Sequence, residues 1–128
     1  MENKKVVLEF WKAMETNDFH KASEWLSEDF KCFWPQSSEI IIGRENFAEI
    51  NTNYPADGKW TFKINSIVSE DDRVVTDVSI SDGTINARAI TFHTVSNDLI
   101  HEQTEFWPDE YNPPEWRKKW VTLINGDS

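Results

Sequence analysis

The sequence has little of four things that many functional sites need: cysteine, glycine, clustered basic residues and long apolar runs. Its one cysteine, Cys32, has no partner for an internal disulfide and cannot form a cysteine-based zinc site. Only 4 glycines occur, and no Walker, Rossmann or G-x-S-x-G motif is found, which argues against a phosphate-binding loop and a serine hydrolase.

Long apolar segments are absent as well. No run of about 18 apolar residues could span a bilayer, and the N-terminal MENKKVVLEF has neither a long apolar region nor a small-residue cleavage site. The sequence therefore predicts a soluble, cytoplasmic protein without a membrane segment or a signal peptide.

Basic residues are few, at 13 against 23 acidic ones, and the formal net charge is −10. Nucleic acids and anionic membranes attract clustered Lys and Arg, so neither is expected as a partner. The three histidines, His20, His93 and His101, are scattered and do not form a metal-ligand spacing. We therefore expect no bound metal and no cofactor.

Aromatic residues, by contrast, are plentiful: the 128 residues include 7 Trp and 8 Phe. Large rings of this kind build cores, pockets and interfaces. A chain of this length favours one domain, here residues 1–128.

Helical periodicity dominates the first part of the chain, up to about residue 53. Apolar residues at helical spacing predict helices over about 2–16, 18–26 and 44–51. Short strands are expected at 30–34, which Pro35 ends, and at 39–42.

From Lys59 the period changes to two, which predicts four antiparallel strands over about 59–69, 73–80, 84–95 and 99–107. Helices followed by a meander, with a short strand contributed early, indicate the α+β class. The tail, 108–128, begins with a proline and ends in a short helix containing Trp116 and Trp120. These two residues are expected either to fold back over the body or to pack on a partner subunit.

The register of the meander follows from loop length if each joint is a two-residue turn at Asp71-Asp72, Asp82-Gly83 or Asn97-Asp98. Asp77 then pairs with Ser66 and with Arg88, and Ile90 pairs with Glu105. This register puts Asp77, Arg88 and Glu105 together in the middle of one face. The other face, which includes His93, is too apolar for water and is expected to form a homodimer interface.

The order of these segments resembles the SnoaL-like branch of the nuclear transport factor 2-like superfamily. The opening VVLEFWKAMETNDFHKASEWLSEDF, the third helix GRENFAEI and the last strand IHEQTEFWPDEYNPPEW carry the resemblance. In the last strand the likeness lies in Ile100 and in Glu105, Phe106, Trp107 and Asp109, an acid followed by two aromatic residues and a second acid. The likeness covers nearly the whole chain.

The resemblance implies a cone, in which the concave face of a curved sheet and the helices enclose a pocket for a small, mostly apolar ligand. It also implies a homodimer through the convex sheet face. Members of this superfamily include polyketide cyclases, ketosteroid isomerases, epoxide hydrolases and dehydratases, and many are not catalytic. An acid on the last strand often acts as general acid or base in the catalytic members, and Glu105 occupies that position.

We therefore expect either a cofactor-free acid–base isomerase, cyclase or hydrolase, or a non-catalytic ligand-binding or dimerisation module. The candidate catalytic residues are Glu105, with Asp77 as its partner and Arg88 to position charge. The alternative for these three is a buried ion network without chemistry. The candidate ligand-binding residues are Trp11, Met14, Trp34, Tyr54, Trp60, Phe62, Ile90, Phe92, Gln103 and Trp107. For the tryptophans, the alternative is ordinary core packing.

Overall fold

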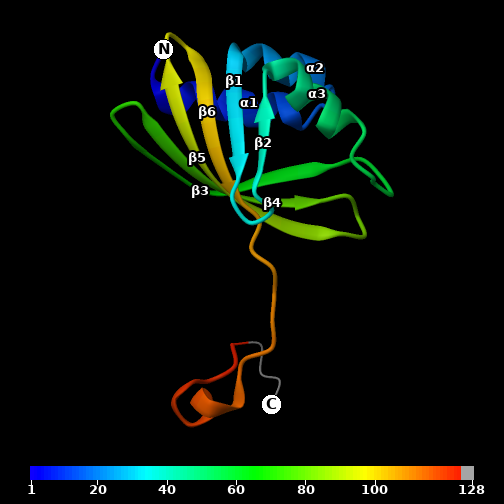
Figure 1. The fold of residues 1–128 in the computed structure, drawn as a ribbon, viewed down its shortest axis with the longest axis vertical. Helices are drawn as coiled ribbons and strands as arrows, with labels where there is room; N and C mark the ends of the chain where they lie inside the picture. The colour runs from blue at the N-terminus through cyan, green and yellow to red at the C-terminus, as the bar shows by residue number, and fades with distance from the viewer. Residues whose placement is uncertain (125–128) are drawn as a thin grey trace.

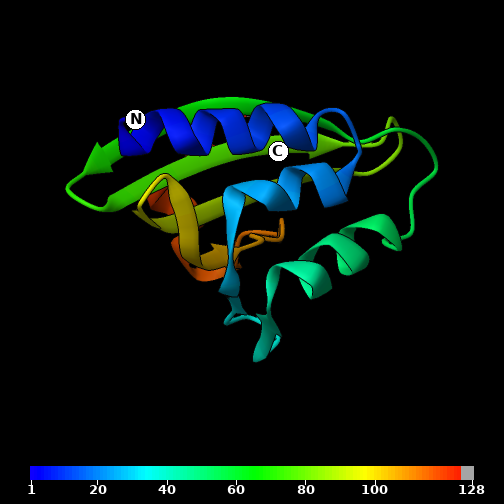
Figure 2. The ribbon, with the colours of Figure 1, turned by 90° about the horizontal axis from the view of Figure 1, so that it is seen from above.

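The helices lie on one face of a six-stranded sheet, as Figures 1 and 2 show for the computed structural model. Residues 1–124 are described; the last four residues of the predicted tail, 125–128, lie outside this range. The helices are α1 (Asn3–Met14), α2 (Phe19–Ala22), which continues as the 3-10 turn η1 (Ser23–Trp25), and α3 (Arg44–Thr52).

Helix α1 is amphipathic, and its apolar stripe is buried against the sheet. After it, Asn17 takes a positive φ of 62° and ties the helix end to the sheet. Its side chain donates a hydrogen bond to the Trp60 carbonyl and accepts one from the Trp60 amide, both at 2.8 Å. Asp18 then caps α2 by accepting a hydrogen bond from the Lys21 amide.

The sheet has the strand order β2-β1-β6-β5-β4-β3. The strands are β1 (Leu26–Trp34), β2 (Glu39–Ile42), β3 (Thr61–Glu70), β4 (Arg73–Ser81), β5 (Asn86–Ser96) and β6 (Leu99–Phe106). Among the strands of residues 1–124, β1 and β6 pair in parallel and the other neighbouring pairs are antiparallel. The predicted α+β class, with a mostly antiparallel sheet and an early strand, is confirmed.

Two of the three predicted turns have the expected length. Glu70 pairs with Arg73, and Ser96 pairs with Leu99, so Asp71-Asp72 and Asn97-Asp98 are two-residue loops. The third prediction is wrong: Ser81 pairs with Asn86, so the β4–β5 loop has four residues, 82–85. Asp82 stabilises this longer loop, because its Oδ1 accepts hydrogen bonds from the amides of Thr84 and Ile85 at 3.0 and 2.7 Å.

The observed register differs from the predicted one at three places. In the β3–β4 pair, a bulge between Ile64 and Ser66 places Ile64 opposite Val78 instead of Ser79. The longer β4–β5 loop moves the pairing by two residues, so Asp77 pairs with Ile90 instead of Arg88. A bulge near His101 moves β6 by one residue, so Glu105 pairs with Thr91 instead of Ile90. The predicted pairing of Asp77 with Ser66 is confirmed.

The one-residue shift changes which residues of β5 share a face with Glu105. Gln103 and Glu105 lie on the inner face, toward the helices, with Thr91 and His93. The buried apolar core lies between this face and the helices and includes Val6, Val7, Phe10, Leu26, Phe30, Val74, Val78, Ala89, Val95 and Ile100. His93, expected at the subunit interface, is instead buried in this core.

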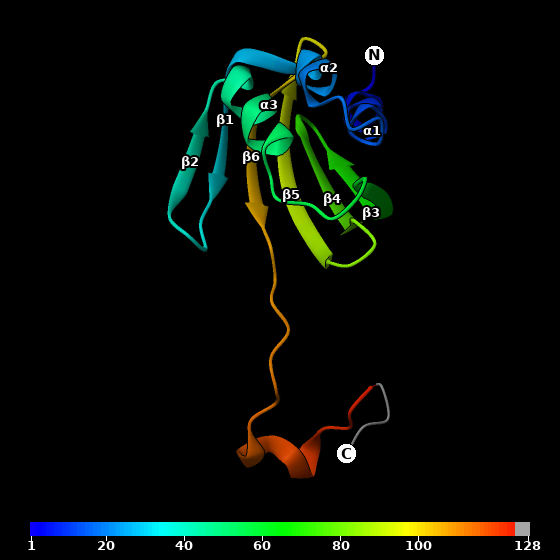
Figure 3. The same ribbon diagram turned by 90° about the vertical axis from the view of Figure 1, so that its right-hand side faces the viewer.

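Beyond β6 the chain leaves the body as an extended segment that ends in η2 (Glu115–Trp120), a 3-10 helix with no buried residue. Figures 1 and 3 show it projecting away from the sheet along the direction of β6. It does not fold back over the body, which was one of its two expected positions. Within residues 1–124, every helix is too short or too polar to cross a bilayer.

Candidate functional site

Glu105 is the centre of the candidate site. It projects from β6 onto the inner face, and the side chain is only 7% exposed. Its Oε1 accepts a hydrogen bond from the Trp34 indole at 3.1 Å, and its Oε2 accepts one from the Thr91 hydroxyl at 2.7 Å. Parallel pairing of β1 with β6 and antiparallel pairing of β5 with β6 bring these two donors to either side of the carboxyl group.

Burial raises the pKa of Glu105, because the ionised form loses its hydration. The hydrogen bonds from Thr91, Trp34 and Trp107 oppose this effect but are the smaller contribution. No Lys, Arg or His among residues 1–124 forms an ion pair with this carboxyl group. The site therefore contains a buried acid whose charge is stabilised by neutral donors alone.

The carboxyl group faces a cavity of about 180 Å³ between the helices and the inner face of the sheet. Aromatic and aliphatic side chains make up most of its wall. The lining residues are Phe10, Trp11, Met14, Phe19, Trp34, Phe47, Asn51, Tyr54, Trp60, Phe62, Ile80, Ile85, Ala87, Gln103, Glu105 and Trp107. A largely apolar cavity with a few polar groups is typical of small-molecule sites.

A groove continues the cavity toward the C-terminal ends of β1 and β6. Trp34, Tyr54, Glu105 and Trp107 line both the cavity and the groove. Glu105 therefore lies where the two meet, and we call this junction the mouth of the pocket. A ligand entering along the groove would pass the carboxyl group.

Asp82 fixes the loops on the other side of the cavity. Its Oδ2 accepts a hydrogen bond from the Asp57 amide at 2.8 Å, and these backbone contacts lower the pKa of Asp82. The neighbouring Gly58 has no room for a side chain, since a Cβ would lie 2.8 Å from the Asp82 carbonyl oxygen. The two loops that carry Tyr54, Trp60 and Ile85 are thus held together by one carboxylate.

Next to Glu105, a second polar group of side chains crosses the inner face. His93 lies within hydrogen-bond distance of Thr76 Oγ1, at 2.8 Å, and of the Gln103 amide, at 2.9 Å. The Trp11 indole donates to Thr76 at 3.2 Å. Burial lowers the pKa of His93 to about 3, so the ring is neutral near pH 7 and orients Gln103 at the wall of the cavity.

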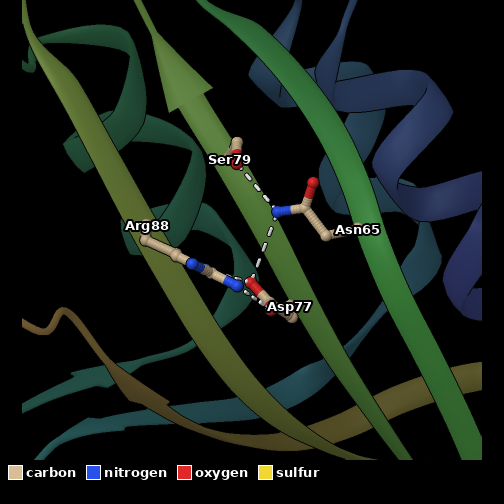
Figure 4. A network of polar contacts seen from close by, with 4 residues as sticks. All are labelled: Asn65, Asp77, Ser79 and Arg88. Atoms are coloured by element: carbon tan, nitrogen blue, oxygen red, sulfur yellow. Dashed lines mark hydrogen bonds and ion pairs between the residues drawn. The ribbon is translucent and has the colours of Figure 1, made fainter. Parts of the chain in front are cut away.

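Asp77 and Arg88 are not part of this site, in contrast to the sequence prediction. They form a bidentate ion pair on the outer face, with Arg88 Nε 2.7 Å from Asp77 Oδ1 and Nη2 2.5 Å from Oδ2. Figure 4 shows the pair beside Asn65 and Ser79, on strands β3, β4 and β5. The hydrogen bond from Arg88 lowers the pKa of Asp77, but the shift in register separates both residues from Glu105.

The predicted ligand-binding residues divide in the same way. Eight of them line the cavity: Trp11, Met14, Trp34, Tyr54, Trp60, Phe62, Gln103 and Trp107. Ile90 and Phe92 do not, because the bulge in β6 leaves them on the outer face, where Phe92 is 41% exposed. Their assignment to the pocket is wrong for the same physical reason as that of Asp77 and Arg88.

Several residues of the site were missed by the sequence analysis. Thr91, which holds Glu105, was assigned to the opposite face, and only knowledge of the bulge could have corrected this. Phe10, Phe19 and Phe47 were detectable, since they lie on the apolar faces of the predicted helices. In residues 1–124 no three His, Cys, Asp or Glu side chains are grouped closely enough to hold a metal ion.

Comparisons with known proteins agree with this architecture. The family described as the SnoaL-like domain matches residues 7–103. A search of curated proteins found no match.

Three solved structures illustrate the structural similarity. A proposed ketosteroid isomerase from Kribbella flavida has 24% identity and a TM-score of 0.86, with 95% of this chain and 89% of that chain covered. An NTF2-like protein of unknown function from Burkholderia xenovorans has 26% identity and a TM-score of 0.78, with 95% and 94% covered. An LEH-like epoxide hydrolase from M. tuberculosis has 16% identity and a TM-score of 0.68, with 83% and 82% covered.

Proposed function

The chain belongs to the family of SnoaL-like domains, and from this premise we propose that it is a cofactor-free acid–base catalyst acting on a small, largely apolar molecule. Glu105 is the proposed proton acceptor and donor. The observation that carries the proposal is a buried carboxyl group with a raised pKa, at the mouth of an apolar cavity, without a cation beside it.

A raised pKa suits a group that both takes up and releases protons, because it moves the titration of a carboxyl group toward neutral pH. Trp34 and Thr91 hold the carboxyl group in one orientation through both oxygens. Each carboxylate oxygen has further lone pairs, so one oxygen remains able to accept a proton.

The reaction class that fits best is isomerisation by proton transfer within the substrate. Glu105 would take a proton from the carbon next to a carbonyl group, which leaves an enolate, and would return that proton to another carbon of the conjugated system. No atom is gained or lost, and the acid regains its initial state. Asn51, Tyr54 and Gln103 are the other polar residues of the lining with groups that can donate to the substrate oxygen.

Epoxide hydrolysis, for which the cluster predicted from the sequence would have supplied two acids and an arginine, has less support. The acid and the arginine that would complete such a set, Asp77 and Arg88, pair with each other on the outer face. Among the activities considered from the sequence, we therefore favour isomerisation or cyclisation over epoxide hydrolysis.

The second candidate function is binding of an apolar ligand without chemistry. The observation in its favour is that both oxygens of Glu105 already accept hydrogen bonds from the protein. In that case, the carboxyl group would orient a bound ligand and exchange no proton with it.

Substitution of Glu105 by glutamine separates the two functions. The assay uses a panel of bicyclic and tricyclic β,γ-unsaturated ketones, whose conversion to conjugated ketones is followed by ultraviolet absorbance. We expect Glu105→Gln to reduce turnover by about 10²–10⁴-fold, the usual contribution of a general acid–base. Binding of the conjugated product, followed by quenching of tryptophan fluorescence, should be retained.

The matched control is Glu102→Gln, which changes an exposed glutamate of the same strand. Turnover of this variant should equal that of the wild-type protein. Full activity of Glu105→Gln would contradict the proposal, while binding of the panel without turnover by the wild-type protein would favour the ligand-binding function.

We also propose that two copies associate through the outer face of the sheet. The register places one residue from each strand in a row across this face: Ile40, Phe33, Thr104, Phe92, Val75 and Val68. Five of the six are apolar, and Phe92 also makes an edge-to-face contact with Phe106, with ring centroids 6.2 Å apart. An apolar row of this kind supports an interface with a second copy.

A further inference from the structure

The C-terminal arm, residues 108–124, exposes three large aromatic side chains. Tyr111, Trp116 and Trp120 are 77%, 73% and 74% exposed. Figures 1 and 3 show that the arm leaves the body at the end of β6 and reaches well beyond it. Several exposed large rings on one short segment indicate an interaction surface rather than isolated surface residues.

The sequence of the arm keeps it away from its own body. Three of the chain's 5 prolines, Pro108, Pro113 and Pro114, precede η2. Proline-rich segments are extended and stiff, at about 3.1 Å per residue. The aromatic residues of η2 are thus carried outward, so the surface that covers them has to come from another molecule.

Two of the structural comparisons extend beyond the body of this chain, whereas the epoxide hydrolase covers 83% of it. The Kribbella flavida and Burkholderia xenovorans crystal structures each match 95% of this chain. The body, residues 1–107 of 128, is too small a share of the chain to account for that coverage. The matches therefore extend into the arm.

Charge indicates which surface this is. Helix η2 contains Arg117, Lys118 and Lys119 against one acid, Glu115, in a chain whose formal net charge is −10. The arm thus presents a basic, aromatic end, and the rest of the molecule is strongly acidic. A second copy of this chain offers the complementary charge.

We propose that the arm packs on a second copy of this chain, so that two copies exchange their C-terminal arms around a twofold axis. Trp116 and Trp120 are the apolar anchors, and the basic residues between them face the acidic body of the partner. The arm follows Trp107, and Trp107 and the arm residue Asp109 both line the groove outside the pocket of their own chain. Exchange of the arms would therefore also hold the residues at the mouth of each chain's own pocket. The proposal does not depend on Glu105 being catalytic.

The first test measures the dimer dissociation constant of the full-length protein by sedimentation equilibrium. We expect Trp116→Asp with Trp120→Asp to raise this constant by about 100-fold, as loss of two buried aromatic anchors does. The matched control is Asn112→Asp with Thr122→Asp, which adds the same charge to exposed polar positions of the arm. Circular dichroism confirms that each variant is folded. An unchanged dissociation constant in the tryptophan variant would overturn the proposal.

The second test locates the arm. Lys118→Cys introduces an exposed thiol, whereas the natural Cys32 is buried and burial raises the pKa of its thiol, so a maleimide photo-crosslinker reacts at residue 118. Chains labelled with ¹⁵N and unlabelled chains are mixed, crosslinked and digested. Crosslinked peptide pairs of mixed isotope composition are expected. Pairs formed only within one chain, or none, would overturn the proposal. Neither readout requires a ligand, so failure here is distinct from failure of the proposed catalysis.

Discussion

At the level of single residues, the site is defined by one buried carboxyl group that has no cation beside it. The sequence analysis selected Glu105 through the resemblance of its last strand to the SnoaL-like branch, and a buried acid needs a special environment. The structure supplies that environment through Trp34 and Thr91. The hydroxyl partner could not be predicted, since it depends on a bulge that no local pattern indicates.

The raised pKa of Glu105 has a consequence for stability that can be measured without a substrate. At a pH below its ordinary pKa the group is protonated in both the folded and the unfolded chain. As the pH rises, the unfolded chain releases the proton first, so the fold loses stability until the folded pKa is passed. The acid thus makes the fold less stable near neutral pH.

We predict that Glu105→Gln becomes progressively more stable relative to the wild-type protein as the pH rises from 4.5. The amide carries no charge, so it escapes the cost of burying a carboxylate. Urea unfolding at pH 4.5, 6 and 8 measures the difference, and Glu102→Gln is again the control. A difference in unfolding free energy that is constant over this pH range would show that ionisation of Glu105 does not destabilise the fold. That result would contradict the raised pKa.

At the level of secondary structure, the periodicities gave a nearly complete account of the elements. Each predicted helix and strand is present within a few residues, because hydrophobic spacing alone separates helix from strand here. The error lay in the pairing of strands. Two features decide the pairing of β4, β5 and β6, the four-residue loop closed by Asp82 and the bulge near His101, and hydrophobic spacing along a strand indicates neither.

Because of these two features, the catalytic cluster predicted from the sequence does not form, and two of its members form an ion pair on the outer face. Asp77 and Arg88 do attract each other, as the sequence suggested, but they lie on the face opposite to Glu105. An ion pair that is largely accessible to water contributes little to stability.

We therefore predict that Asp77→Asn and Arg88→Met leave ligand affinity and turnover unchanged. Neither side chain lines the cavity, and neither forms a hydrogen bond to a lining residue in the described part of the chain. The measurement is steady-state turnover of the ketone panel, with Glu105→Gln as the positive control for loss of activity. A tenfold or greater loss of turnover in either variant, at a protein concentration where its oligomeric state is unchanged, would show that the ion pair contributes to the site.

At the level of the whole molecule, the sheet has two faces with different tasks. The inner face holds the core and the pocket, and the outer face carries the apolar row that crosses all six strands. The sequence analysis expected one face against the helices and the other against a second copy. It exchanged many of the residues of β4 and β5 between the two faces, because a slip of one residue moves every side chain of a strand to the opposite side.

The proposed interface predicts that Phe92→Asp dissociates the dimer, since Phe92 lies near the middle of the apolar row. A carboxylate buried there without a partner should raise the dissociation constant at least about 100-fold. The control is Ile42→Asp, an exposed residue of the same face whose neighbours across the strands are the charged Lys31 and Glu102. Sedimentation equilibrium compares both variants with the wild-type protein.

A monomeric wild-type protein would contradict the interface, and so would a Phe92→Asp dimer as strong as that of the Ile42→Asp control. Because the arm contributes separately, a dimer that survives Phe92→Asp and still yields crosslinks of mixed isotope composition from residue 118 would assign the contact to the arm alone.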